Sequence, residues 1–151
     1  MIKVIGIDPD MRKCGVCALN DGGIDLLISD ATAALMDSIR YAVAEDTWFA
    51  VEDVNAVKTI YAKNRRSNVA VQTRIAQNVG MVKAAGTILV DYIEHLGGKV
   101  ILVPPGIGKQ TKRNAKLFAE LTGYKGSTNE DTRDAYWIAK YAYNKLKNGE
   151  L

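Results

Sequence analysis

Residues 3–9 read Lys-Val-Ile-Gly-Ile-Asp-Pro, and they predict the first element of the fold. The run up to Asp8 is short, apolar and partly β-branched, and Pro9 and Asp10 follow it with turn-forming chemistry, which is typical of a buried strand. A carboxylate at the end of such a strand is costly unless another group compensates its charge. Asp8 therefore marks this end of the strand as a candidate functional site.

Two more strands are predicted to follow the first in a meander. Residues 14–19 and 24–29 are rich in apolar side chains. The Asn-Asp-Gly-Gly sequence at 20–23 lies between them and is a strong hairpin signal. We therefore expect the first three strands to be neighbours in one sheet.

Strands then alternate with helices along the rest of the chain. The expected elements are a helix at 32–45 capped by Thr32, a strand at 48–54, a basic loop at 55–68, a long helix at 68–96, a strand at 99–103, a helix at 109–121 and a last helix at 129–147 capped by Asn129. This order predicts an α/β fold with a five-stranded mixed sheet and helices on both faces. Ligand sites on such sheets lie beyond the strand ends.

The length and composition indicate one cytoplasmic domain. With 151 residues, the chain 1–151 is expected to form a single domain. Its two cysteines are too few for a disulfide framework, and no apolar run approaches the ~20 residues of a membrane span. The N-terminus resembles a core strand rather than a signal peptide. We therefore expect a cytoplasmic protein with no membrane partner.

Positive charge is segregated along the chain, although the net charge is only +3. Residues 54–90 and 95–119 contain no acid and are rich in Lys and Arg. This is the footprint expected of a polyphosphate partner, although a solvated basic face would give the same pattern. Tyr61 could stack on an unpaired base or be an ordinary half-exposed tyrosine. The residues predicted to contact nucleic acid are Lys58, Tyr61, Lys63, Arg65, Arg66, Arg74, Lys109, Lys112 and Arg113.

Three further acids lie where they could join Asp8. Glu52 ends a predicted strand, and Asp131 and Asp134 share one face of the last helix because they are three residues apart. Helix capping would also explain this pair, and Glu130 competes with Asp131 because it lies four residues before Asp134. Converging carboxylates repel one another, and hard divalent cations such as Mg²⁺ relieve that repulsion. The four acids together predict a metal-dependent phosphodiesterase.

Several motifs, in a fixed order, carry a resemblance to a known family. They are Ile-Gly-Ile-Asp-Pro at 5–9, followed by Arg12 and Gly15; Phe-Ala-Val-Glu-Asp-Val at 49–54; the stretch 72–85 with Gln77 and Gly80; Gly-Ile-Gly-Lys at 106–109 with Lys112; and Asp-Thr-Arg-Asp-Ala at 131–135 with Ile138 and Ala139. This order resembles that of RuvC-type Holliday junction resolvases. Asp10 departs from the pattern, because the family commonly has glycine after the proline.

The resemblance implies a ribonuclease H-like fold and a homodimer that resolves four-way DNA junctions by paired nicks. It implies that the catalytic, metal-binding acids are Asp8, Glu52, Asp131 and Asp134. The cofactor would be two Mg²⁺ ions per site, with Mn²⁺ able to substitute, and the products would carry a 5′-phosphate. Lys109 or Lys112 would stabilise charge on the phosphate.

Other functions stay open at this point. The same metal chemistry would serve another ribonuclease H-like nuclease that cuts flaps, other branched DNA or RNA–DNA hybrids, and a junction-binding protein that does not cut would share the basic segments. The helix at 68–96 carries many small residues, which would pack either on the sheet or against the same helix of a second subunit.

Overall fold

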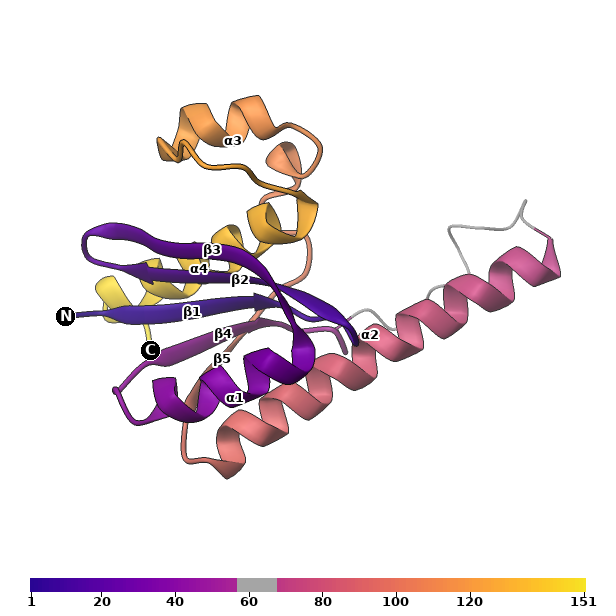
Figure 1. Ribbon diagram of the computed structural model, residues 1–151, viewed down its shortest axis with the longest axis horizontal. Helices are drawn as coiled ribbons and strands as arrows, with labels where there is room; N and C mark the ends of the chain where they lie inside the picture. The colour runs from indigo at the N-terminus through magenta and orange to yellow at the C-terminus, as the bar shows by residue number, and fades with distance from the viewer. Residues whose placement is uncertain (57–67) are drawn as a thin grey trace.

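The computed structural model describes residues 1–56 and 68–151, which form a five-stranded sheet in the order β3-β2-β1-β4-β5 (Figure 1). The strands are β1 (Lys3–Asp8), β2 (Lys13–Asn20), β3 (Gly23–Ala31), β4 (Trp48–Glu52) and β5 (Lys99–Val103). β1, β2 and β3 form an antiparallel meander, whereas β4 pairs parallel with both β1 and β5. The mixed α/β sheet predicted from the sequence is confirmed.

The pairing register brings two strand ends to the same edge of the sheet. Ile7 of β1 lies beside Val51 of β4 in a parallel pair, so Asp8 and Glu52 follow at neighbouring positions. Asp8 is also paired with Gly15 of β2 across the antiparallel ladder. Asp8, at the end of the central strand β1, is therefore flanked by the start of β2 on one side and by the end of β4 on the other.

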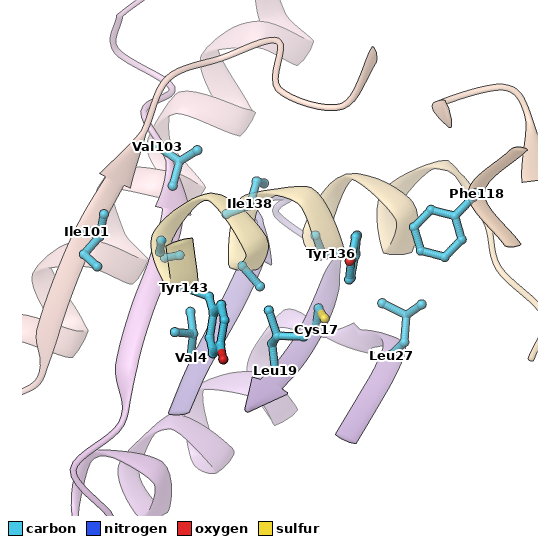
Figure 2. Close-up of a cluster of buried hydrophobic side chains, with 14 residues drawn as sticks. Val4, Cys17, Leu19, Leu27, Ile101, Val103, Phe118, Tyr136, Ile138 and Tyr143 are labelled. Carbon is cyan, nitrogen blue, oxygen red and sulfur yellow. The ribbon is translucent and has the colours of Figure 1, made fainter. Parts of the chain in front are cut away.

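Helices cover both faces of the sheet. The helices in the described part of the chain are α1 (Thr32–Val43), α2 (Val69–His95), α3 (Ala115–Thr122) and α4 (Glu130–Lys147), with a 3₁₀ turn, η2, at Lys109–Thr111. α4 packs on one face, in a core that includes Val4 and Cys17 from the sheet (Figure 2). α1 and α2 cover the opposite face, in a core that includes Ile7 and Phe49.

The alternation of side chains along β1 decides which of them face α4. Successive side chains of a strand point to opposite faces. Val4 and Gly6 contact the α4 side, and Ile5 and Ile7 pack on the α1 and α2 side. Asp8 continues the first series, so its side chain lies on the face that α4 covers.

Two glycines let α4 lie close to the sheet. A Cβ atom on Gly6 would collide with the backbone of Ala135 and Ala139, and a Cβ atom on Gly15 would collide with the carbonyl group of Asp131. Gly15 belongs to the strand pair that holds Asp8. The lack of a side chain at these two positions therefore brings the first turn of α4 onto the end of β1.

The predicted helix at 109–121 is wrong in its first half. η2 ends at Thr111, and α3 begins only at Ala115. Between them lies Asn114, whose side-chain oxygen accepts a hydrogen bond from the N–H of Leu117 at 2.9 Å. Asparagine stabilises a helix start better than a helix interior, so the chain turns here instead of continuing one helix.

The two predicted helix caps have different outcomes. The cap at Thr32 is wrong, because Ala31 takes the cap position and the Thr32 hydroxyl donates a hydrogen bond to the Asp10 carbonyl at 2.7 Å. The cap at Asn129 is confirmed. Its side-chain oxygen accepts from the N–H of Thr132, and the Thr132 hydroxyl accepts from the N–H of Asn129, which completes a capping box.

The two halves of α2 differ in burial. Its buried residues, Ala85, Gly86, Leu89 and Ile93, lie in the C-terminal half, and the N-terminal half extends past the edge of the sheet (Figure 1). Packing against the domain therefore accounts for part of the small-residue pattern, and a dimer contact through the remainder stays a prediction. No helix in residues 1–56 or 68–151 has the length and apolar character needed to cross a membrane.

Candidate active site

Four acidic side chains from three separate elements come together at one end of the sheet. Asp8 ends β1, Glu52 ends β4, and Asp131 and Asp134 lie in the first two turns of α4. The register of β1 with β4 places the first two side by side, and the close approach of α4 at Gly15 adds the second two. The acids predicted from the sequence therefore form one cluster, in which the charges of the other three act on Asp8.

Burial dominates the electrostatics of Asp8. The pKa of its carboxyl is raised from 3.8 to about 8, chiefly by burial and then by the charges of Glu52, Asp134 and Asp131, whereas Lys112 lowers it. At neutral pH this carboxyl holds its proton unless further positive charge is brought to it. A buried acid among other acids is typical of a functional site.

Glu52 and Asp134 share this environment. Burial is the largest cause that raises the pKa of each carboxyl above its ordinary value. For Glu52, the charge of Asp134 adds to the rise, while a hydrogen bond from the Gly106 N–H opposes it. Both carboxyls therefore favour the protonated form more than they would in water, and a nearby cation would favour the ionised form.

Lys112 supplies positive charge inside the cluster. Its Nζ lies 3.1 Å from Oδ2 of Asp134, and this hydrogen bond raises the pKa of the lysine and lowers that of the aspartate. Its charge also lowers the pKa of Asp8 and Glu52. The ammonium group therefore partly offsets the negative charge of the acids.

The chemistry of the cluster suits a hard divalent cation, although its side chains do not form a coordination shell. Carboxylate oxygens are ligands of Mg²⁺ and Mn²⁺, and Lys112 contributes one positive charge against four acids. Within residues 1–56 and 68–151, no three Asp, Glu, His or Cys side chains are close enough together to hold a metal ion. The four acids are the residues that would hold such a cation.

A cavity of about 550 Å³ opens beside the acids. Glu52 and Asp134 line one side of it, and the basic residues Lys109, Lys112 and Arg113 line it as well. We call residues 109–113 the basic segment. Its three cations were predicted to contact nucleic acid, and the structure places all three next to the acidic cluster, where an anionic group could be held between the two kinds of charge.

Glu130 lies at the rim of the cluster rather than within it. Its Oε1 is 3.8 Å from Nε of Arg113, and both side chains are well exposed to solvent. Asp131, and not Glu130, is among the charges that raise the pKa of Asp8. Both acids are exposed and both act on Asp134, but only Asp131 also acts on Asp8, and this favours Asp131 as the fourth member of the cluster.

No protein-family model and no curated protein sequence matches the chain. Among solved structures, RuvC from T. thermophilus in complex with a Holliday junction substrate matches with a TM-score of 0.58 at 18% identity, covering 99% of this chain and 97% of that one. A second Thermus thermophilus RuvC structure matches with a TM-score of 0.55 at 18% identity, covering 98% and 97%. The fold is that of RuvC. The match extends over almost the whole of both chains, and at 18% identity it establishes the architecture alone.

Of the other predicted contacts, only Arg74 lies in the described part of this RuvC-like fold. Arg74 is exposed on the N-terminal half of α2 and does not line the cavity. The remaining predicted DNA contacts, Lys58, Tyr61, Lys63, Arg65 and Arg66, lie outside the described residues, as does most of the predicted basic loop. Their contribution stays a prediction from the sequence.

Arg133, one residue before Asp134, belongs to the surroundings of this site in the RuvC-like fold but was not among the predicted site residues. Its side chain is buried, with 6% exposure, and donates hydrogen bonds to the chain around Thr111 and Lys112. A signal was available in the sequence. Arg133 precedes Tyr136 and Trp137 by three and four residues, so it extends their side of α4.

The raised pKa of Asp8 predicts a pH-dependent stability of the metal-free protein. The folded-state pKa, about 8, lies above the unfolded value of 3.8. The stability that this group contributes is therefore fully present below about pH 4 and is lost as pH rises to about 8. We expect Asp8→Asn, with chelator present, to gain stability over the wild type between about pH 5 and about pH 8, by on the order of 1–3 kcal/mol. Urea unfolding across this range measures the gain.

Asp37→Asn is the matched control for this measurement, because Asp37 is an exposed aspartate on α1. Its replacement leaves the acidic cluster unchanged, so it should not give the gain in stability expected for Asp8→Asn. If the stability gained by Asp8→Asn does not change with pH, Asp8 does not hold a proton in the folded protein.

Proposed function

We propose that this protein is a metal-dependent, structure-selective DNA endonuclease that resolves four-way junctions. The observation that carries the proposal is the convergence of Asp8, Glu52, Asp131 and Asp134 at one end of a RuvC-like sheet. The basic segment beside them supplies the charge that a phosphodiester substrate needs. One of the matching RuvC structures holds a Holliday junction substrate, and this supports branched DNA as the partner.

The four acids would hold two Mg²⁺ ions, with Mn²⁺ able to replace them. When bound, such a pair supplies an activated water and stabilises charge on the attacking and leaving oxygens. Asp8 lies at the centre of the cluster and would serve both ions. Partial burial of Asp8, Glu52 and Asp134 removes some of their solvation, which strengthens their interaction with cations.

The basic segment would bind the scissile phosphate and orient it toward the acids. Lys112 already lies within the cluster, and Lys109 and Arg113 line the same cavity. Ammonium and guanidinium groups make strong charge-assisted hydrogen bonds to phosphate oxygens. Cleavage that leaves a 5′-phosphate and a 3′-hydroxyl would give nicks that a ligase can seal, as DNA recombination and repair require.

The symmetry of the substrate favours a homodimer. Resolution of a four-way junction takes two cuts related by a two-fold axis, and a C₂ dimer supplies two equivalent sites. The N-terminal half of α2 extends past the sheet and exposes Val69 and Met81. This half of α2 would form the dimer contact, with Arg74 and the basic loop reaching the DNA arms.

A panel of substrates tests the proposal. The protein is incubated with a synthetic four-way junction, a flapped duplex and an RNA–DNA hybrid, each with Mg²⁺, with Mn²⁺ and with chelator. We expect paired, ligatable nicks in the junction with either metal and none with chelator. Preferential cutting of the hybrid or the flap would assign a different ribonuclease H-like nuclease, and tight junction binding without cutting would assign a binding protein.

A further inference from the structure

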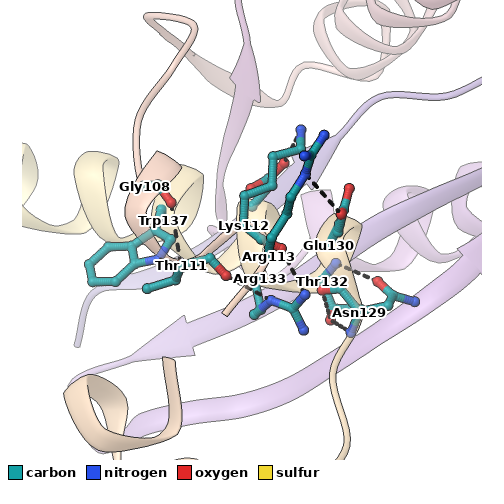
Figure 3. A network of polar contacts seen from close by, with 10 residues as sticks. Gly108, Thr111, Lys112, Arg113, Asn129, Glu130, Thr132, Arg133 and Trp137 are labelled. Atoms are coloured by element: carbon teal, nitrogen blue, oxygen red, sulfur yellow. Dashed lines mark hydrogen bonds and ion pairs between the residues drawn. The ribbon is translucent and has the colours of Figure 1, made fainter. Parts of the chain in front are cut away.

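A buried guanidinium lies beneath the basic segment (Figure 3). Arg133 of α4 is only 6% exposed. Arginine is almost never fully buried unless its charge is satisfied by partners. Here the hydrogen-bond acceptors are neutral oxygens of other segments, so the side chain serves to join those segments to α4.

The three hydrogen bonds of Arg133 connect α4 to two stretches of chain. Nε donates to the carbonyl of Thr111 at 3.0 Å, and Nη2 donates to the carbonyl of Lys112 at 2.7 Å. Nη1 donates to Oγ1 of Thr128 at 2.8 Å. A planar guanidinium can donate along several directions at once, which the single ammonium of lysine cannot reproduce. Two successive carbonyls of the basic segment are therefore held by one side chain.

A second contact from α4 holds the same segment one turn further along. Nε1 of Trp137 donates to Oγ1 of the fully buried Thr111 at 2.7 Å. Gly108 has a φ of 77° and lies so close that a Cβ atom there would collide with the Trp137 ring. Arg133 and Trp137 thus contact the basic segment on both sides of Asp134 in the sequence, so the acid and the cations share one helix as their support.

We propose that Arg133 is a positioning residue that sets where Lys112 lies in the acidic cluster. Arg133 holds the backbone of Lys112 while Asp134, the next residue of α4, contacts its ammonium group at 3.1 Å. Lys112 is therefore bound at both ends by neighbouring residues of one helix. The effect of Arg133 on cleavage rests on the proposed function, whereas its effect on the position of the segment does not.

Hydrogen–deuterium exchange tests the position of the segment without metal or DNA. In the wild type, the N–H groups of Thr111, Lys112 and Asn114 are bonded to nearby carbonyls within the segment or next to it. We expect Arg133→Met to speed exchange over residues 109–114 by about tenfold or more, since a hydrogen bond to a charged group is worth at least an order of magnitude. Exchange in β1 should not change. Thr128→Val is the matched control, because it removes only the bond that does not reach the segment, and it should exchange like the wild type.

A double-mutant cycle tests whether Arg133 acts through Lys112. Single-turnover cleavage of the junction is compared for Arg133→Met in the wild-type and Lys112→Met backgrounds, with junction affinity measured in parallel. We expect a loss of about tenfold or more in the first background and less than about threefold in the second, because residues that act together are not additive. If the wild type cuts no substrate, the proposed function fails and the exchange result still decides the role of Arg133.

Two outcomes would overturn the inference. Unchanged exchange over residues 109–114 would show that Arg133 does not hold the segment. Equal losses of cleavage in both backgrounds would show that it acts by a route other than Lys112. If Arg133→Met does not fold at the assay temperature, Arg133→Lys takes its place with the same outcomes, because lysine keeps the charge and lacks the planar fork.

Discussion

Asp8→Asn abolishes Mg²⁺-dependent cleavage and leaves junction binding intact, if the acidic cluster is the active site. The charges of the other three acids all act on Asp8, so Asp8 is the central carboxylate of the cluster. Asp8→Asn removes this carboxylate. We expect the single-turnover rate to fall at least about 1,000-fold, which corresponds to ~4 kcal/mol of barrier. Binding should persist because the cations of the basic segment are untouched. Gel-shift titration in chelator and single-turnover cleavage in Mg²⁺ measure the two quantities.

Glu130→Gln is the matched control for this experiment. Glu130 is the acid that pairs with exposed Arg113 at the rim, so its loss should change the cleavage rate by less than about threefold, as expected for an exposed ion pair. Asp131→Asn should instead resemble Asp8→Asn. Retained cleavage by Asp8→Asn would remove the site assignment, and a greater loss in Glu130→Gln than in Asp131→Asn would exchange the roles of these two residues.

Gly15→Ala destabilises the protein and displaces α4 from the site. A Cβ atom at this position collides with the backbone of Asp131, which cannot turn aside as a flexible side chain would. Overpacking of this kind costs about 1–3 kcal/mol, and the shift moves Asp131 and Asp134 away from Asp8. We expect a lower urea midpoint and a loss of cleavage that is larger than the fraction of unfolded protein explains.

Gly80→Ala is the contrasting change, because Gly80 lies within α2 and a Cβ atom added there would have no neighbour within 4 Å outside its own helix turn. Alanine in a helix interior is more favourable than glycine by about 0.5–1 kcal/mol, so this variant should be slightly more stable than the wild type. A Gly15→Ala protein with wild-type stability and wild-type cleavage would show that α4 does not depend on this close approach.

The acids at the strand ends could be predicted from the sequence because strand length and apolar character are local properties. The boundaries of β1 and the acidic residue at the end of β4 follow from such runs. The neighbour relationship of β1 and β4 depends on the topology of the sheet, which local patterns do not specify. The close approach of α4 to Gly15 also could not be predicted from local sequence, because the contact is with Asp131, more than one hundred residues away.

The basic segment was less predictable than the acids. In a single helix over residues 109–121, Lys109 and Lys112 would lie on the same helix face, so the sequence did not indicate which of them reaches the acids. In the structure the chain turns at Asn114, and the turn presents Lys112 to Asp134. The spacing of Arg133 to Tyr136 and Trp137 indicates its side of α4, but the acceptors of its side chain are mainly backbone carbonyls, which no sequence pattern identifies.

The packing of α4 onto the first strand also bears on when the acidic cluster is completed during synthesis of the chain. The ribosome delivers Asp8 and Glu52 early, whereas Asp131 and Asp134 emerge only after more than seventy further residues have been added beyond Glu52. A nascent chain that ends before α4 has only two of the four acids. It also lacks Arg133 and Asp134, which contact Lys112. If the proposed nuclease activity holds, translation products that end before α4 would not cleave DNA, because they lack two of the four acids.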